Sequence, residues 1–146
     1  MKKVCIFFLL ISCLLCSTSC EPMTELFNTM YGMRQATYLT RDFWNAIGDG
    51  NFDEAESMID PDSPLCGDEL KNYLSTLEKE NNLDFSDNLR VLFDDSYTMI
   101  SADKNFERAY VTECVIVINN TSYLVSMLTV DDERGFGIYR FSINNI

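Results

Sequence analysis

The sequence predicts an α+β domain in which N-terminal helices pack on an antiparallel sheet of about four strands. Apolar residues recur every three or four positions between residues 24 and 79, and from residue 89 onward they alternate with polar ones. Short turns join the strand segments, and no repeat or Pro/Gly/Ser-rich linker divides the chain. Strands joined in this way form an antiparallel meander, and helices covering one of its faces give the simplest packing. A single folded domain is therefore expected over residues 38–146.

Three helices are expected before the strands. The first covers residues 24–48 and ends at Gly48-Asp49-Gly50, which tolerate the left-handed conformation of a helix C-terminus. The second is short, because Asn51 followed by Glu54 resembles a capping box and a proline soon ends the helical pattern. The third covers residues 68–79, where three leucines and a tyrosine follow helical spacing. Each helix offers one apolar face for the sheet.

The turn between the first two helices has an alternative interpretation as a calcium loop. Asp49, Asn51 and Asp53 stand at alternate positions, as the oxygen ligands of such a loop do. A calcium loop also needs Gly at its sixth position and a bidentate Glu at its twelfth. Counted from Asp49, these positions hold Glu54 and Asp60. We therefore interpret the acids as helix caps and solvated surface, and no metal site is expected.

The second half of the chain has the two-residue period of strands. Apolar side chains alternate at positions 89, 91 and 93 and again at 97 and 99. Asn119-Asn120 predicts a tight turn between two β-branched and aromatic segments, and an acidic turn ending in Gly135 precedes the last strand. The three strands after the first are expected at 109–118, 123–130 and 136–143.

The first 19 residues have the pattern of a secretory signal peptide. Two lysines precede an apolar run over residues 4–16, and small residues follow it. A bilayer span needs roughly 20 apolar residues, so a run of 13 is too short to serve as a stable anchor.

Cys20 directly follows these small residues, and the arrangement resembles the lipoprotein signal of Bacteroidetes-type bacteria. In such signals the cysteine is acylated and becomes the mature N-terminus, which predicts a lipid-anchored protein of the bacterial cell envelope. Residues 20–37 would then be the lipidated cysteine and an N-terminal segment. The alternative is cleavage by ordinary signal peptidase, which leaves Cys20 as a free thiol.

The composition excludes several classes of function. Without Lys2 and Lys3, 9 basic residues face 23 acidic ones, and a mature charge near −14 disfavours nucleic acid and anionic lipid as partners. The chain contains no histidine, which excludes Ser-His and Cys-His catalysis and His-ligated zinc. No motif indicates a cofactor.

Two cysteines remain in the mature domain besides Cys20. Cys66 and Cys114 could form one disulfide in an oxidising compartment, or both could be buried free thiols. Neither belongs to a Cys-x-x-Cys pair.

Two phrases resemble the nuclear transport factor two-like (SnoaL-like, cone-shaped α+β) superfamily. One is FWNAIGDGNFDEAESMIDPDS at residues 43–63, and the other is ERGFGIYRFSI at residues 133–143. The secreted bacterial branches of unassigned function look closest. The resemblance implies a curved sheet around the first helix, an apolar cavity between them, and a homodimer formed through the sheet.

The same resemblance implies which side chains would line that cavity. Asp42, just before the apolar helix face, is the one acid expected near its rim. No residue set matches a catalytic motif of the superfamily. The expected lining residues are Tyr38, Phe43, Tyr97, Tyr110, Tyr123, Tyr139 and Phe141.

The leading hypothesis is a non-catalytic, lipid-anchored binding domain with a basic protein as partner. Acidic surfaces of this kind bind basic ones in a salt-sensitive way. One alternative is an enzyme of the isomerase, dehydratase or hydrolase type that uses an ionisable side chain in the cavity. Another is a carrier that holds an apolar ligand there.

Overall fold

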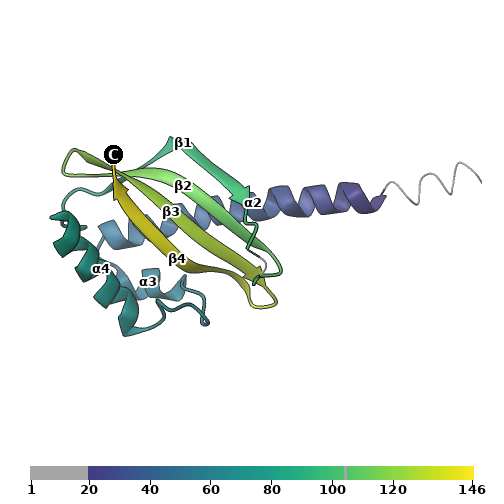
Figure 1. The fold of residues 1–146 in the computed structure, drawn as a ribbon, viewed down its shortest axis with the longest axis horizontal. Helices are drawn as coiled ribbons and strands as arrows, with labels where there is room; N and C mark the ends of the chain where they lie inside the picture. Colours follow the sequence, from purple (N-terminus) through teal and green to yellow (C-terminus); the bar gives the residue numbers. More distant parts are fainter. Residues whose placement is uncertain (1–19, 104) are drawn as a thin grey trace, which may run out of the picture. The chain divides into compact units, whose positions relative to one another are not determined.

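The computed structural model describes residues 20–103 and 105–146 (Figure 1). The chain separates into two compact units, Met1–Tyr31 and Gly32–Ile146. The second unit contains the sheet and begins six residues before the predicted domain. Within the described residues, no helix is both long and apolar enough to cross a membrane.

Helix α2 covers Cys20–Gly48 and begins four residues before the predicted start of the first helix. In its second half, Ala36, Phe43 and Trp44 are fully buried, which is the apolar face that the helical spacing predicts. Gly32 allows this half to approach the sheet closely. A Cβ atom there would lie 1.9 Å from the hydroxyl oxygen of Tyr110, so a larger residue would force the Tyr110 side chain or the helix to move.

Two shorter helices follow. Helix α3 covers Phe52–Ser57, and helix α4 covers Asp68–Asn81. The capping box is confirmed: Asn51 Oδ1 accepts a hydrogen bond from the Glu54 backbone, and Asn51 Nδ2 donates to the Glu54 carboxylate at 2.7 Å.

The sheet has the strand order β1-β2-β3-β4, and every neighbouring pair is antiparallel. Asn119 and Asn120 both have positive φ, 48° and 65°, as the tight turn between β2 and β3 requires. A parallel bridge between Ile59 and Ile138 lies along the outer edge of β4. The strands are β1 Arg90–Ile100, β2 Ala109–Ile118, β3 Thr121–Asp132 and β4 Gly135–Asn145.

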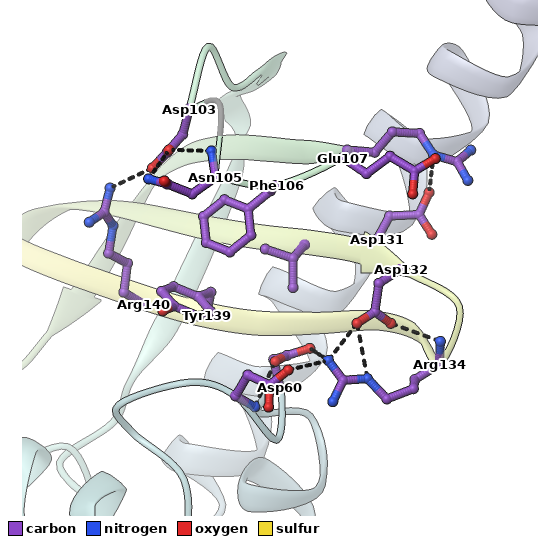
Figure 2. Close-up of a pocket in the computed structure, with 13 residues that line it drawn as sticks. Asp60, Asp103, Asn105, Phe106, Glu107, Asp131, Asp132, Arg134, Tyr139 and Arg140 are labelled. Atoms are coloured by element: carbon purple, nitrogen blue, oxygen red, sulfur yellow. Dashed lines mark hydrogen bonds and ion pairs between the residues drawn. The ribbon is translucent and has the colours of Figure 1, made fainter.

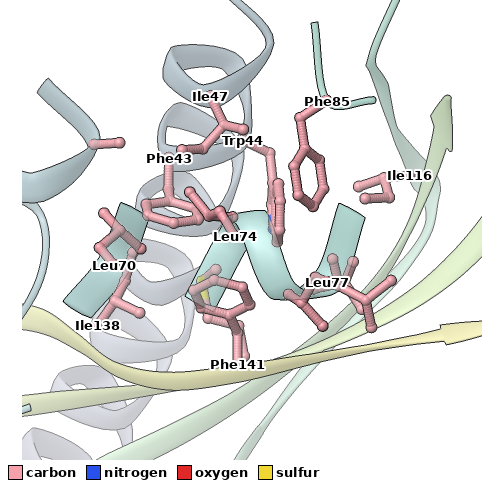
Figure 3. Packing of buried hydrophobic residues seen from close by; sticks show 14 of the residues in the cluster. Phe43, Trp44, Ile47, Leu70, Leu74, Leu77, Phe85, Ile116, Ile138 and Phe141 are labelled. Atoms are coloured by element: carbon pink, nitrogen blue, oxygen red, sulfur yellow. The ribbon is translucent and has the colours of Figure 1, made fainter. Parts of the chain in front are cut away.

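The main core lies between the helices and one face of the sheet (Figure 3). The ring of Phe141 from β4 lies 5.3 Å from that of Phe43 and 5.2 Å from that of Trp44. Tyr73 of α4 contacts the same ring and donates a hydrogen bond of 2.9 Å to the Phe141 carbonyl. Helices and sheet thus share one apolar interior, and the predicted α+β class is confirmed.

The strands contain two irregularities that the alternation did not predict. The register between β1 and β2 shifts between Leu92 and Tyr97, so the two predicted alternations belong to one interrupted strand. A second shift lies between β3 and β4, where Leu128 pairs with Arg140 but Thr129 pairs with Ile138. Tyr139 is therefore an extra residue in β4, and its side chain is free to leave the regular pattern.

Candidate functional site

A charged cleft of about 470 Å³ lies at one end of the sheet (Figure 2). It forms where the loop after β1 and the turn between β3 and β4 approach the segment after α3. Six carboxylates and three guanidinium groups line it around a small apolar floor. The charged residues are Asp60, Asp62, Asp103, Glu107, Arg108, Asp131, Asp132, Arg134 and Arg140.

Arg134, in the β3–β4 turn, binds three carboxylates at one wall of the cleft. Its Nη2 atom lies 2.8 Å from Asp62 Oδ2, and its Nε donates to Asp132 Oδ2 at 2.9 Å. The hydrogen bonds from Arg134 lower the pKa of Asp132 below its ordinary value. Hydrogen bonds to Asp132 and Asp62 raise the pKa of the Arg134 guanidinium, so the pair of Arg134 and Asp132 is ionised at neutral pH.

The third partner of Arg134 is Asp60, whose side chain is only 4% exposed and whose Oδ2 lies 3.6 Å from Nη2. The backbone N–H of Asp60 donates to the Ile138 carbonyl at 2.9 Å, which ties this segment to β4. The other carboxylate oxygen accepts the Asp62 N–H at 2.8 Å. A buried carboxylate with these partners is a fixed part of the wall.

The opposite wall is held more loosely. Arg108 Nε lies 3.4 Å from Asp131 Oδ2, and Arg140 Nη2 lies 3.8 Å from Asp103 Oδ2. Both arginine side chains are more than half exposed. Burial raises the pKa of Asp131, and the nearby charge of Arg108 only partly offsets the rise. These carboxylates therefore have less compensating positive charge than those around Arg134.

Two aromatic side chains form the floor of the cleft. The rings of Phe106 and Tyr139 meet edge to face with centroids 4.7 Å apart. They pack on a second, smaller apolar cluster on the sheet face away from the helices, made of Ala109, Leu128 and Val130. The aromatic floor gives the cleft a surface on which a flat or aliphatic group can pack.

This arrangement suits a cation that carries an apolar stem. Acidic residues outnumber arginines by six to three, and the floor offers aromatic rings to a positive charge. In the described part of the chain, no three His, Cys, Asp or Glu side chains gather closely enough to hold a metal ion. Lysine and arginine side chains have the required stem and charge.

The residues predicted to line an apolar cavity do not converge on one cavity. Phe43 and Phe141 are packed in the aromatic core, and Tyr123 is buried in the same cluster. Tyr110 is buried against Gly32, and burial raises the pKa of its hydroxyl. These four lie on the helix side of the sheet.

The other three predicted lining residues lie elsewhere. Tyr97 is 50% exposed and donates a hydrogen bond to Glu113, on the face away from the helices. Tyr139 lines the charged cleft because the extra residue in β4 turns it from the face that Phe141 occupies. Tyr38 is half-buried on α2 and accepts a hydrogen bond from Arg34. Asp42 is exposed and pairs with Arg41 at 3.0 Å.

The two cysteines of the folded domain are both free thiols in this structure. Cys114 is central in β2 and buried, and burial raises the pKa of its thiol to about 12. Cys66 is exposed in the segment before α4, so only one of the two thiols is buried as the other alternative expected.

Cys20, the predicted acylation site, is the first residue of α2. The predicted signal peptide, residues 1–19, lies outside the described residues. No protein-family model, curated protein or solved structure matches the chain.

Sequence reasoning missed the charged cleft. Asp131, Asp132 and Arg134 lie within four residues at the end of β3 and the following turn, and the sequence indicated only that they belong to a turn. Asp60 and Asp103 come from distant segments, and no local pattern connects them to that turn. One feature of the sequence could have indicated the cleft: several acidic residues fall in loops at one end of the predicted meander.

Proposed function

We propose that this chain is a lipoprotein of the bacterial cell envelope, acylated at Cys20, whose domain binds a basic segment of another protein without catalysis. We further propose that it belongs to the nuclear transport factor two-like superfamily, on the two sequence phrases above. The observation that carries the binding proposal is the acidic majority in a cleft with an aromatic floor.

The charges of the cleft support a basic occupant. Asp103, Glu107 and Asp131 lie on the wall where the arginines are more than half exposed and their ion pairs are long. Long ion pairs whose arginine is open to solvent are weak, so an incoming cation can replace that arginine. The whole mature chain is also strongly acidic, which speeds the approach of a basic partner.

The apolar floor favours a basic side chain as the ligand, in preference to a free cation. Phe106 and Tyr139 lie between the two walls, where the stem of a lysine or arginine can pack on them. A guanidinium or ammonium group above such rings gains a cation–π interaction of about 0.5–2 kcal/mol. The cleft therefore recognises both parts of a basic side chain.

The test uses the acylated full-length protein in phosphatidylcholine nanodiscs and a fluorescent hexa-arginine peptide. Binding is measured by anisotropy at low and high salt. We expect saturable binding that weakens as salt rises, because the contacts are ionic. The cleft variant replaces three carboxylates by amides and should weaken binding about tenfold or more, equivalent to about 1.4 kcal/mol. Its substitutions are Asp103→Asn, Glu107→Gln and Asp131→Asn.

A matched control removes three exposed acids elsewhere, through Asp49→Asn, Asp53→Asn and Glu80→Gln. This control has the same net charge as the cleft variant, so it separates the cleft from the overall field of the protein. Equal weakening in both variants would overturn the assignment of the cleft. Binding that salt does not change would overturn the ionic mechanism.

A further inference from the structure

The first turns of α2 carry five large apolar side chains that none of the described residues of their unit covers. Each is between 58% and 64% exposed. Single exposed apolar residues are ordinary on protein surfaces, but a contiguous group marks an interaction site. The five residues are Met23, Leu26, Phe27, Met30 and Tyr31.

These five side chains, the N-terminal stripe, share one face of the helix. With about 100° between successive residues, they fall within an arc of about 140°. Glu25 lies about 170° from the centre of that arc, so its carboxylate is on the other side of the helix. The first basic residue after Cys20 is Arg34. The stripe is thus an apolar surface without charge.

The spacing of the stripe residues in the sequence only partly matches that of the buried residues later in the chain. Phe27 and Phe43 are 16 residues apart, a rotation of about 160° on an ideal helix, whereas Leu26 and Trp44 are 18 residues apart and have the same angle. All five side chains of the stripe are exposed, so these residues require a partner of their own.

We propose that the N-terminal stripe lies in the apolar–polar interface of the lipid bilayer, directly beside the acyl anchor. This inference rests on the proposed acylation of Cys20. Met23 is three residues from Cys20, which is about 4.5 Å along the helix axis. The acyl chains hold this segment at the membrane surface, so its effective concentration there is far above that for any soluble partner.

The chemistry of the segment selects the type of lipid surface. Amphipathic helices that lie in the interface bury their apolar face about 5–10 Å deep, and many add lysine or arginine to bind anionic lipid. Here the side opposite the stripe carries Glu25, and residues 21–33 contain no lysine or arginine. The stripe therefore suits a zwitterionic surface and gains nothing from anionic headgroups.

The test places a tryptophan on the stripe in the acylated full-length protein. The single native tryptophan, Trp44, is fully buried and supplies a constant baseline. Phe27→Trp probes the stripe, and Asn28→Trp, about 100° around the helix, is the matched control. Both variants are reconstituted into phosphatidylcholine vesicles with brominated acyl chains, which quench tryptophan at short range. We expect Phe27→Trp to lose most of its added emission, and Asn28→Trp to keep most of it.

Flotation with the vesicles and metabolic labelling by an alkyne fatty acid distinguish the two proposals. Protein that is labelled and floats while Phe27→Trp stays unquenched would overturn the interfacial stripe and leave the anchor intact. Protein that is neither labelled nor floats would overturn the anchor itself. A second copy as the occupant would give an emission shift that depends on protein density without bromine quenching, and this result would also overturn the inference.

Discussion

On the helix-covered face of the sheet, Phe141 is 5% exposed and contacts three aromatic rings, whereas Met99 on the opposite face is 45% exposed. The covered face joins three helices and the sheet in one core. Among the described residues, the open face has a small apolar cluster at the end where the charged cleft lies. The difference indicates that one face of the sheet stabilises the fold, so side chains on the other can vary with function.

The largest expected effect comes from truncating the covered face. Phe141→Ala should lower the free energy of unfolding by about 3–5 kcal/mol, because it leaves a cavity among well-packed rings. Met99→Ala should change it by no more than about 0.5 kcal/mol. Urea denaturation followed by circular dichroism measures both. Similar losses in the two variants would show that the open face is also part of the core.

Removing a buried hydroxyl from the covered face should have a smaller effect of opposite sign on the free energy of unfolding. Thr129 is fully buried, and its Oγ1 has no hydrogen-bond partner among the described residues. Thr129→Val removes the polar atom without changing the shape, so the free energy of unfolding should rise by about 1 kcal/mol.

Thr112 provides the matched control for that prediction. It is equally buried, but its hydroxyl shares a hydrogen bond of 2.9 Å with Thr98. Thr112→Val should therefore lower the free energy of unfolding by about 0.5–1.5 kcal/mol. Thermal or urea unfolding that ranks the two variants in the reverse order would contradict the assignment of partners.

The smallest expected effect is a change in stability with pH that comes from the protonation of Asp131 in the cleft. Burial, Asp132 and Glu107 raise the pKa of Asp131, and Arg108 opposes them. The folded chain thus binds this proton more tightly than the unfolded one. The resulting stabilisation is present below about pH 4 and is lost as the pH rises through the raised pKa. Asp131→Asn should reduce this loss, measured as a smaller decrease of the urea midpoint between pH 4 and pH 7.

The stability contribution of Asp132 should change with pH in the opposite direction, so Asp132 serves as the control. Its pKa is lowered by Arg134, so its stabilisation is present above about pH 4 and is lost as the pH falls through the lowered value. Asp132→Asn should therefore be less stable than wild type at pH 7. If the stability of the two variants changed with pH in the same way, the arginines would compensate the carboxylate charges equally at both walls of the cleft.

Local periodicity predicted the fold well. Helical spacing located α4 to within two residues at its end, and the Asn119-Asn120 turn was placed correctly because few residues tolerate positive φ. The start of α2 was less accurate because residues 20–23 have no apolar repeat.

The site could not be predicted in the same way. Tyr139 and Phe141 are two residues apart and would share a face in a regular strand, but the extra residue in β4 separates them. The cleft depends on contacts between residues more than 70 positions apart, such as Asp62 and Arg134. Such contacts follow from the packed fold and leave no mark on local spacing.

The short bridge between Ile59 and Ile138 has a consequence for how copies of this protein behave when crowded together. An exposed outer strand can pair with the same strand of a neighbour and start aggregation. Here the bridge occupies part of the outer edge of β4, and the register shift interrupts β1 at the other edge. The outer edges of both terminal strands are therefore less regular templates for edge-to-edge pairing between molecules.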